Sequence, residues 1–195
     1  TGRMLRAMVD QLTPMDCPQH KIVSLVGNIA TDGSATLYDV VSRVADTVKA
    51  PHYPMPLPVI ATTVQDKAVL LAQKPVRNVI ELGRQADVTF VGIGIMGDDA
   101  ALIRDGFVKP EEMRALVKAG AVGEIIGWAY DAQGQLIEGQ TNDRVVSAPL
   151  DQPARRRVIG LAMAPPRLNA VKGALVGKLI NGLITNEKMA ELLLK

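Results

Sequence analysis

Aromatic residues are scarce in this sequence. One Trp, three Tyr and two Phe make up only 3% of its 195 residues. Proteins that bind single-stranded nucleic acid stack the bases on exposed aromatic rings, and lectin surfaces stack sugars on such rings in the same way. The composition therefore argues against both classes, and Ala, Val, Leu and Ile must supply the core.

An excess of charge of one sign is also lacking. The 22 Lys and Arg residues nearly balance the 20 Asp and Glu residues, so the formal net charge is +2. A DNA-binding module concentrates positive charge on one surface, which argues against DNA binding by these residues themselves. The longest basic run, Arg155–Arg157, is more typical of a solvated entry to a strand than of phosphate recognition.

Cysteine and histidine are nearly absent. Cys17 is the single cysteine, and His20 and His52 are the two histidines. Because no Cys or His cluster has the spacing of metal ligands, we expect no metal site, and the lone cysteine suits a reducing cytoplasm. Two histidines leave little material for a Ser–His–Asp or Cys–His pair, so the sequence favours a binding domain over an enzyme.

Long apolar runs are missing as well. None reaches the ~18 residues that a membrane span needs, and the N-terminus lacks the charged-then-apolar layout of a signal peptide. We therefore expect neither a membrane partner nor export, and we expect a cytoplasmic protein.

The hydrophobic pattern that is present predicts one α/β domain. Short β-branched runs at 22–26, 88–93 and 158–162 are typical of buried parallel strands. Helical spacing of apolar residues predicts helices at 37–48, 74–85 and 110–120. Alternation of such segments predicts a Rossmann-like, mostly parallel sheet with helices on both faces.

The remaining segments complete this pattern. The Pro-rich run 51–58 is expected to lead into a strand at 59–61, and residues 125–131 and 136–139 are expected to form a hairpin around the loop 131–134. Near the C-terminus we expect a helix at 168–175, a strand at 179–185 and a helix at 186–194 that Thr185 caps.

Glycines after two of the predicted strands mark the place to look for a ligand. Gly27 and Asn28 follow one strand and Gly94 closes another, and ligands of open α/β sheets bind at the carboxyl ends of strands. Glu124 lies between Gly123 and Gly127 where a helix is expected to give way to a strand. Its carboxylate could accept ligand hydroxyls, or it could be an ordinary turn carboxylate, and the sequence leaves both possibilities open.

Four motifs in order carry a family resemblance across nearly the whole chain: 2–5 (Gly-Arg-Met-Leu), 88–94, 120–124 and 181–187. With these motifs the sequence resembles the C-terminal effector-binding domain of SorC-type bacterial transcriptional regulators. The resemblance implies the fold shared by ribose-phosphate isomerases, glucosamine-phosphate deaminases and CoA transferases.

The resemblance also implies a function. Such a domain binds a phosphorylated sugar or polyol and thereby controls how a separate helix-turn-helix domain holds operator DNA, without a cofactor, in a homodimer or homotetramer. Two alternatives remain open: a sugar-phosphate isomerase or deaminase with Glu124 or Asp39 as base, and a purely structural oligomerisation module.

Motif by motif, the resemblance assigns effector-binding residues. Gly2, Arg3 and Met4 match the loop that takes the phosphate, although Met4 stands where the family has a Thr hydroxyl. Gly27 and Asn28 match the second glycine loop.

The other matching positions lie further along the chain. Asp39 matches a polar helix position that faces the ligand, Gly94 matches the third loop, and Glu124 matches the acidic residue for ligand hydroxyls. Arg167 falls near a position that is usually Lys, and a guanidinium cannot form a Schiff base.

The motif at 2–5 follows the first strand of the effector domain in this family. The resemblance therefore implies that residues 1–195 are an effector-binding domain whose first strand and helix-turn-helix domain precede Thr1, in a chain of roughly 300 residues.

Overall fold

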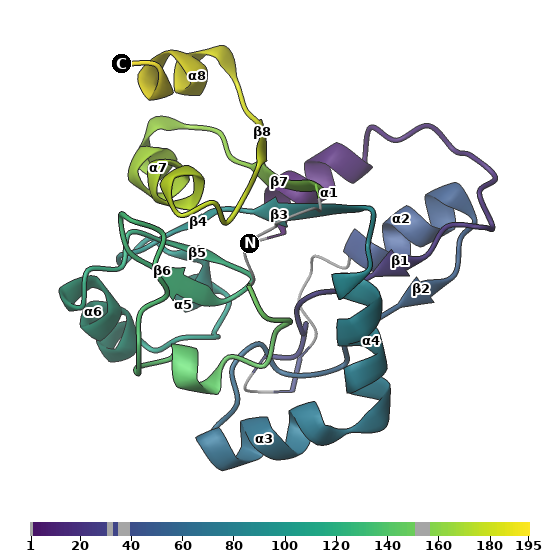
Figure 1. Ribbon diagram of the computed structural model, residues 1–195, viewed down its shortest axis with the longest axis horizontal. Coiled ribbons are helices and arrows are strands. Elements are labelled where there is room, and N and C mark those ends of the chain that lie inside the picture. Colours follow the sequence, from purple (N-terminus) through teal and green to yellow (C-terminus); the bar gives the residue numbers. More distant parts are fainter. Residues whose placement is uncertain (1, 31–32, 35–39, 151–156) are drawn as a thin grey trace.

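A computed structural model describes residues 2–30, 33–34, 40–150 and 157–195 of the chain. The described part is mixed α/β, as expected, but its strands form three small sheets rather than one (Figure 1). Two of the sheets are parallel and one is antiparallel, so the predicted single, mostly parallel sheet is confirmed only in part.

The first parallel pair consists of β1 (Ile22–Val23) and β2 (His52–Tyr53). Between them in sequence lies α2 (Val40–Val48), and α1 (Arg3–Val9) packs against α2. β1 covers only the start of the strand predicted at 22–26. The strand predicted at 59–61 is wrong, because this segment makes only an isolated bridge from Ile60 to Val145.

The larger parallel sheet has the strand order β3–β7–β8. Its strands are β3 (Val88–Gly92), β7 (Arg157–Leu161) and β8 (Gly182–Ile184). They confirm the predicted strands near 88, 158 and 182. The main core cluster packs against this sheet and comprises Val91, Ile93, Ile125, Tyr130, Val158, Ala162, Ala170, Val171, Ala174, Leu179 and Ile180.

The antiparallel sheet joins β4 (Gly94–Ile95), β5 (Gly123–Ile125) and β6 (Trp128–Tyr130). The predicted hairpin is confirmed in part: an antiparallel bridge joins Tyr130 and Leu136 across the loop 131–134, but a further tight turn at 126–127 interrupts the first predicted strand. The turn expected at 131–134 does form, because the Asp131 carboxylate accepts from the amides of Gln133 and Gln135. Beyond it the chain makes only one bridge back to Tyr130.

Helices cover these sheets. The remaining ones are α3 (Val64–Ala72), α4 (Lys74–Arg84), α5 (Ala101–Arg104), α6 (Pro110–Lys118), α7 (Leu168–Val176) and α8 (Glu187–Leu193), with 3₁₀ turns at Asn142–Arg144 and Pro165–Arg167. The sequence analysis did not predict α3, although a Thr63–Asp66 capping box marks its start.

The predicted cap of the last helix is off by one residue. The side chain of Asn186, not Thr185, accepts from the amide of Met189 at 3.1 Å. The Thr185 hydroxyl is buried and has no hydrogen-bond partner among the described residues. Among the described residues no helix is both long and apolar enough to cross a membrane.

Candidate functional site

A large cavity, with a volume of about 820 Å³, lies between the two parallel sheets. Residues from α1, from 19–28 and from β3 line it, and so do Glu124, Ile126 and Gly127 at the turn of the β5–β6 hairpin. It contains four of the predicted effector-binding residues: Gly2, Gly27, Asn28 and Glu124. The tertiary structure therefore gathers residues that are up to 122 positions apart, from Gly2 to Glu124, around one space.

The Glu124 carboxyl forms part of the cavity wall. Glu124 is only 1% exposed, and its Oε2 accepts a hydrogen bond of 2.9 Å from the amide of Gly127. Burial raises the pKa of the Glu124 carboxyl above its ordinary value; the Gly127 amide acts in the opposite direction, and the charge of Asp105 adds to the rise. A carboxyl in such a place can donate or accept toward a ligand hydroxyl, depending on its protonation.

Gly94 makes room for this carboxyl. Gly94 stands opposite Glu124 in the β4–β5 ladder, and a Cβ at Gly94 would lie 2.0 Å from the Glu124 Oε1 atom. No side chain larger than hydrogen fits there without displacing the carboxyl. The cavity lining does not include Gly94, so the geometry connects this glycine to the placement of Glu124 rather than to a loop around the ligand.

The turn that holds Glu124 in place is strained. Ile126 and Gly127 both have positive φ, 46° and 90°, and together they form the two-residue loop between β5 and β6. Such primed turns match the twist of a hairpin. A β-branched residue at positive φ is a genuine outlier, and outliers of this kind concentrate at binding sites. Ile126 itself lines the cavity.

The Gly27–Asn28 loop lies beside the cavity, but packing already explains its glycine. A Cβ at Gly27 would lie 2.0 Å from the carbonyl oxygen of Leu57. The amide of Ile29 donates to that same carbonyl at 3.2 Å. Gly27 therefore lets two backbone segments approach each other, while Asn28 is the polar residue of this loop in the cavity lining.

The segment that was expected to be a phosphate-binding loop is helical. Gly2 is the N-cap residue of α1, and Arg3 and Met4 lie in its first turn. Arg, Met and Leu are strong helix formers, which accounts for the difference. Gly2 lines the cavity, whereas Arg3 is exposed, and neither Arg3 nor Met4 belongs to the lining.

Arg167 lies at the end of a 3₁₀ turn beside the β3–β4 junction. Its Nε donates to the carbonyl of Ile93 and an Nη donates to the carbonyl of Met163, both at 3.2 Å. The guanidinium is thus held next to Gly94 but does not line the cavity. Asp39 lies outside the described residues.

The sequence analysis missed several polar residues of the cavity. Gln19, His20, Lys21, Gln85, Asp87 and Thr89 line it, and His20 is also exposed at the surface. Lys21 directly precedes β1, and its position next to a predicted strand could have suggested that it lines the cavity. The described residues contain no group of three or more His, Cys, Asp or Glu side chains that could hold a metal ion.

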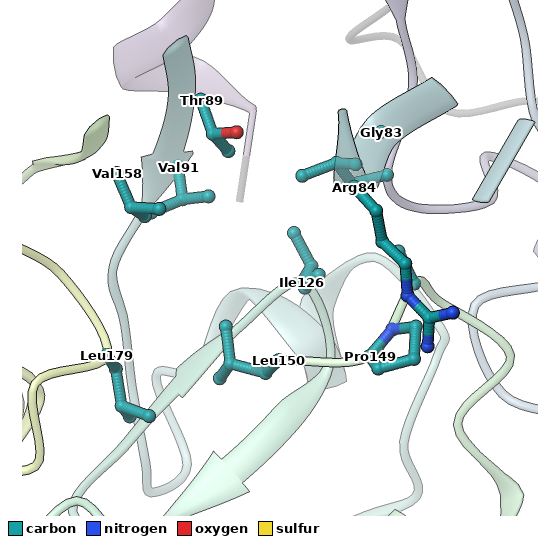
Figure 2. Close-up of a pocket in the computed structure, with 11 residues that line it drawn as sticks. Gly83, Arg84, Thr89, Val91, Ile126, Pro149, Leu150, Val158 and Leu179 are labelled. Atoms are coloured by element: carbon teal, nitrogen blue, oxygen red, sulfur yellow. The ribbon is translucent and has the colours of Figure 1, made fainter. Parts of the chain in front are cut away.

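A second, much smaller cavity adjoins the first, and Figure 2 shows the side chains that line it. Its volume is about 30 Å³, and mostly apolar side chains such as Val91, Ile126, Leu150 and Leu179 face it. A space of this size holds about one water molecule and no sugar. It shares Leu25, Gly83, Thr89, Val91 and Ile126 with the large cavity, so the two adjoin.

A comparison with known protein families identifies the family of the chain. The Sugar-bind family model, described as "Putative sugar-binding domain", matches residues 1–195. The chain belongs to this family.

Curated relatives of this sugar-binding domain are named as regulators. The domain is 32% identical to the erythritol catabolism regulatory protein EryD of Brucella abortus (strain 2308) over 193 residues, which are 99% of this chain and 61% of that protein. It is 29% identical to the deoxyribonucleoside regulator of Bacillus subtilis (strain 168), covering 98% of this chain and 62% of that protein. The expected resemblance to SorC-type regulators is confirmed, and these names give no support to the enzyme alternative.

Solved structures have the same fold. The full-length sorbitol operon regulator SorC of Klebsiella pneumoniae superposes with a TM-score of 0.89 at 26% identity over 100% of this chain and 64% of that one. A domain of a possible sugar-binding transcriptional regulator from Arthrobacter aurescens TC1 gives 0.89 at 21% identity, over 100% of this chain and 76% of that one.

Proposed function

We propose that this domain senses a phosphorylated sugar or polyol in the cytoplasm and controls the binding of operator DNA by a helix-turn-helix domain elsewhere in the full-length protein. The observation that carries the proposal is the buried Glu124 carboxyl in the wall of the 820 Å³ cavity. A buried carboxyl is unfavourable unless it is paired, and ligand hydroxyls would supply the partners that water supplies elsewhere.

The polar groups of the site divide between two parts of a ligand. Glu124 and Asn28 are suited to hydroxyl groups, because both side chains form several hydrogen bonds. Lys21 carries positive charge at the lining, to which Gly2 and Gly27 also belong. This combination supports a ligand with several hydroxyls and one anionic group.

Regulation requires that the ligand bind two arrangements of the protein with different affinity. We place the two arrangements in a homodimer or homotetramer of the full-length protein, of which this chain is the sensing domain. The two parallel sheets with flanking helices are also compatible with the fold of ribose-phosphate isomerases and CoA transferases, and we propose that the complete domain has it.

A thermal-shift screen tests the sensing function. Each sugar or polyol is offered free and phosphorylated, at matched concentration, to the full-length protein. A true effector at one hundred times its Kd stabilises the folded state by about 2.7 kcal/mol, which for a domain of this size raises the Tm by roughly 5–10 °C. A folded protein whose Tm no compound raises would contradict the proposal.

Two variants locate the ligand. Glu124→Gln keeps the shape of the side chain and should abolish most of the effector's Tm shift, while Glu138→Gln at an exposed position should leave it unchanged. Asn28→Ala should weaken binding, and Asn169→Ala, exposed on α7, is its control. DNA binding is then followed by fluorescence anisotropy with and without the effector, using the full-length protein.

A further inference from the structure

Trp128 connects the turn beside Glu124 with the helix α3. It is the first residue after the turn at 126–127, and it pairs with Ile125 in the β5–β6 ladder. We propose that Trp128 is a positioning residue for the Glu124 carboxyl, held between α3 and the segment 145–148, and that it couples effector binding at Glu124 to α3. The coupling to an effector rests on the proposed function, whereas the positioning role does not.

Two contacts fix the Trp128 indole. Its Nε1–H donates to the carbonyl of Ala148 at 2.9 Å. The Lys67 ammonium of α3 lies over the ring, with Nζ 5.0 Å from the ring centroid, which is a cation–π contact. The same Nζ donates to the carbonyl of Asn142 at 3.4 Å. The indole therefore joins a helix and a loop that are far apart in the sequence.

The Lys67 ammonium is partly shielded from water. Burial lowers the pKa of Lys67, and the charge of Asp143 acts in the opposite direction. A cation–π contact is stronger when the cation is desolvated than when water surrounds it. The contact between Lys67 and Trp128 therefore contributes to holding the indole in place.

The turn that precedes Trp128 needs such support. Ile126 has a positive φ of 46°, and a β-branched residue keeps this conformation only where its surroundings hold it there. A Cβ at Gly127 would lie 3.8 Å from the buried Ser147 hydroxyl, which has no hydrogen-bond partner among the described residues. Ser147 thus adds no bond that would hold the turn. The contacts of Trp128 help to fix the turn, and with it the Gly127 amide that donates to Glu124.

The helix α3 is suited to respond to the turn. All of its residues are at least partly exposed, and it lies at the edge of the molecule, away from the β3–β7–β8 sheet (Figure 1). Elements with few buried contacts are the ones that move in allosteric proteins. Coupling free energies are reciprocal, so a ligand that shifts the turn affects α3, and a change at α3 affects the turn. The coupling can therefore be tested from the side of α3, without any ligand.

Hydrogen exchange at the Gly127 amide tests the proposal in the full-length protein without an effector. This amide donates to Glu124, so its exchange rate reports how firmly the turn is held. Lys67→Met keeps the length of the side chain but removes the ammonium, and it should speed the exchange of Gly127 about two- to fivefold. Lys74→Met, at an exposed position where α4 begins, is the matched control and should leave the rate unchanged. An unchanged rate in Lys67→Met would overturn the proposal.

Two further variants assign the effect to Trp128. Trp128→Phe keeps a ring beneath Lys67 but loses the bond to Ala148, and it should speed the exchange of Gly127 about two- to tenfold. In Trp128→Leu, which has no ring, adding Lys67→Met should change nothing further. An effect of Lys67→Met that persists there would overturn the proposal, because it would act through the Asn142 carbonyl. Faster exchange throughout β8, in step with Gly127, would mean general destabilisation and would overturn it as well.

A last measurement separates the coupling from the proposed function. The emission of Trp128 is obtained as the difference between wild type and Trp128→Phe. It should change when a compound that raises the Tm in the thermal-shift screen is added, and the change should be smaller in Lys67→Met. A bound compound that leaves the emission unchanged would overturn the coupling to α3. A screen without any binder would contradict the proposed function and leave the positioning role to the hydrogen-exchange result.

Discussion

Adding a methyl group at Gly94 should displace the Glu124 carboxyl and destabilise the domain. A Cβ there would lie 2.0 Å from Oε1 and 2.7 Å from Cδ of Glu124. Ordinary contacts between such atoms are about 3.5 Å, so the carboxyl must move by more than 1 Å or the β4–β5 pair must open. Overpacking of a core costs about 1–3 kcal/mol. For a domain of this size, Gly94→Ala should therefore lower the Tm by roughly 2–12 °C.

A double-mutant cycle shows whether the clash with Glu124 is the cause. Once Glu124→Ala removes the carboxyl, Gly94→Ala should have little further effect, with a coupling free energy of about 1 kcal/mol or more. Gly182→Ala is the control, because a Cβ at this strand glycine would meet Ile159 at 3.3 Å, a far milder contact. Urea unfolding followed by the fluorescence of Trp128 gives the free energies. Equal effects of Gly94→Ala in both backgrounds would refute this explanation.

Three further predictions concern stability. Because burial raises the pKa of the Glu124 carboxyl in the folded state, the folded protein binds more protons than the unfolded one, and stability is lost as the pH rises above about 4.5. Glu124→Gln should therefore gain stability relative to wild type with rising pH, whereas Glu138→Gln should not. Parallel curves of Tm against pH for wild type and Glu124→Gln would contradict this. The Asn142 amide accepts from the amide of Ala129 and donates to the carbonyls of Ala129 and Ile137, so Asn142→Ala should reduce the free energy of unfolding by about 2–4 kcal/mol in urea titrations. Loss of the helix cap in Asn186→Ala should cost about 1 kcal/mol by the same assay.

Local patterns predicted much of the fold correctly. The helices at 74–85 and 110–120 and the strands near 88, 158 and 182 were found because one buried face imposes its period on the sequence. One error came where the pairing partner is distant, because Ile60 in the strand predicted at 59–61 meets only Val145, in an isolated bridge. The other error was local, because a tight turn at 126–127 interrupts the segment predicted as one strand at 125–131, where Trp128 pairs with Ile125.

The sequence by itself determined that this is an α/β domain, and its ordered motifs determined the family. It also singled out Glu124, because a carboxylate among glycines stands out locally. Only the tertiary structure decided what surrounds that carboxylate. The Gly127 amide donates to it, Gly94 leaves room for it because a glycine has no Cβ, and Gly2 and Asn28 line the same cavity. Burial and register are long-range properties, since they depend on strands that meet across the fold, and no local pattern of residues encodes them.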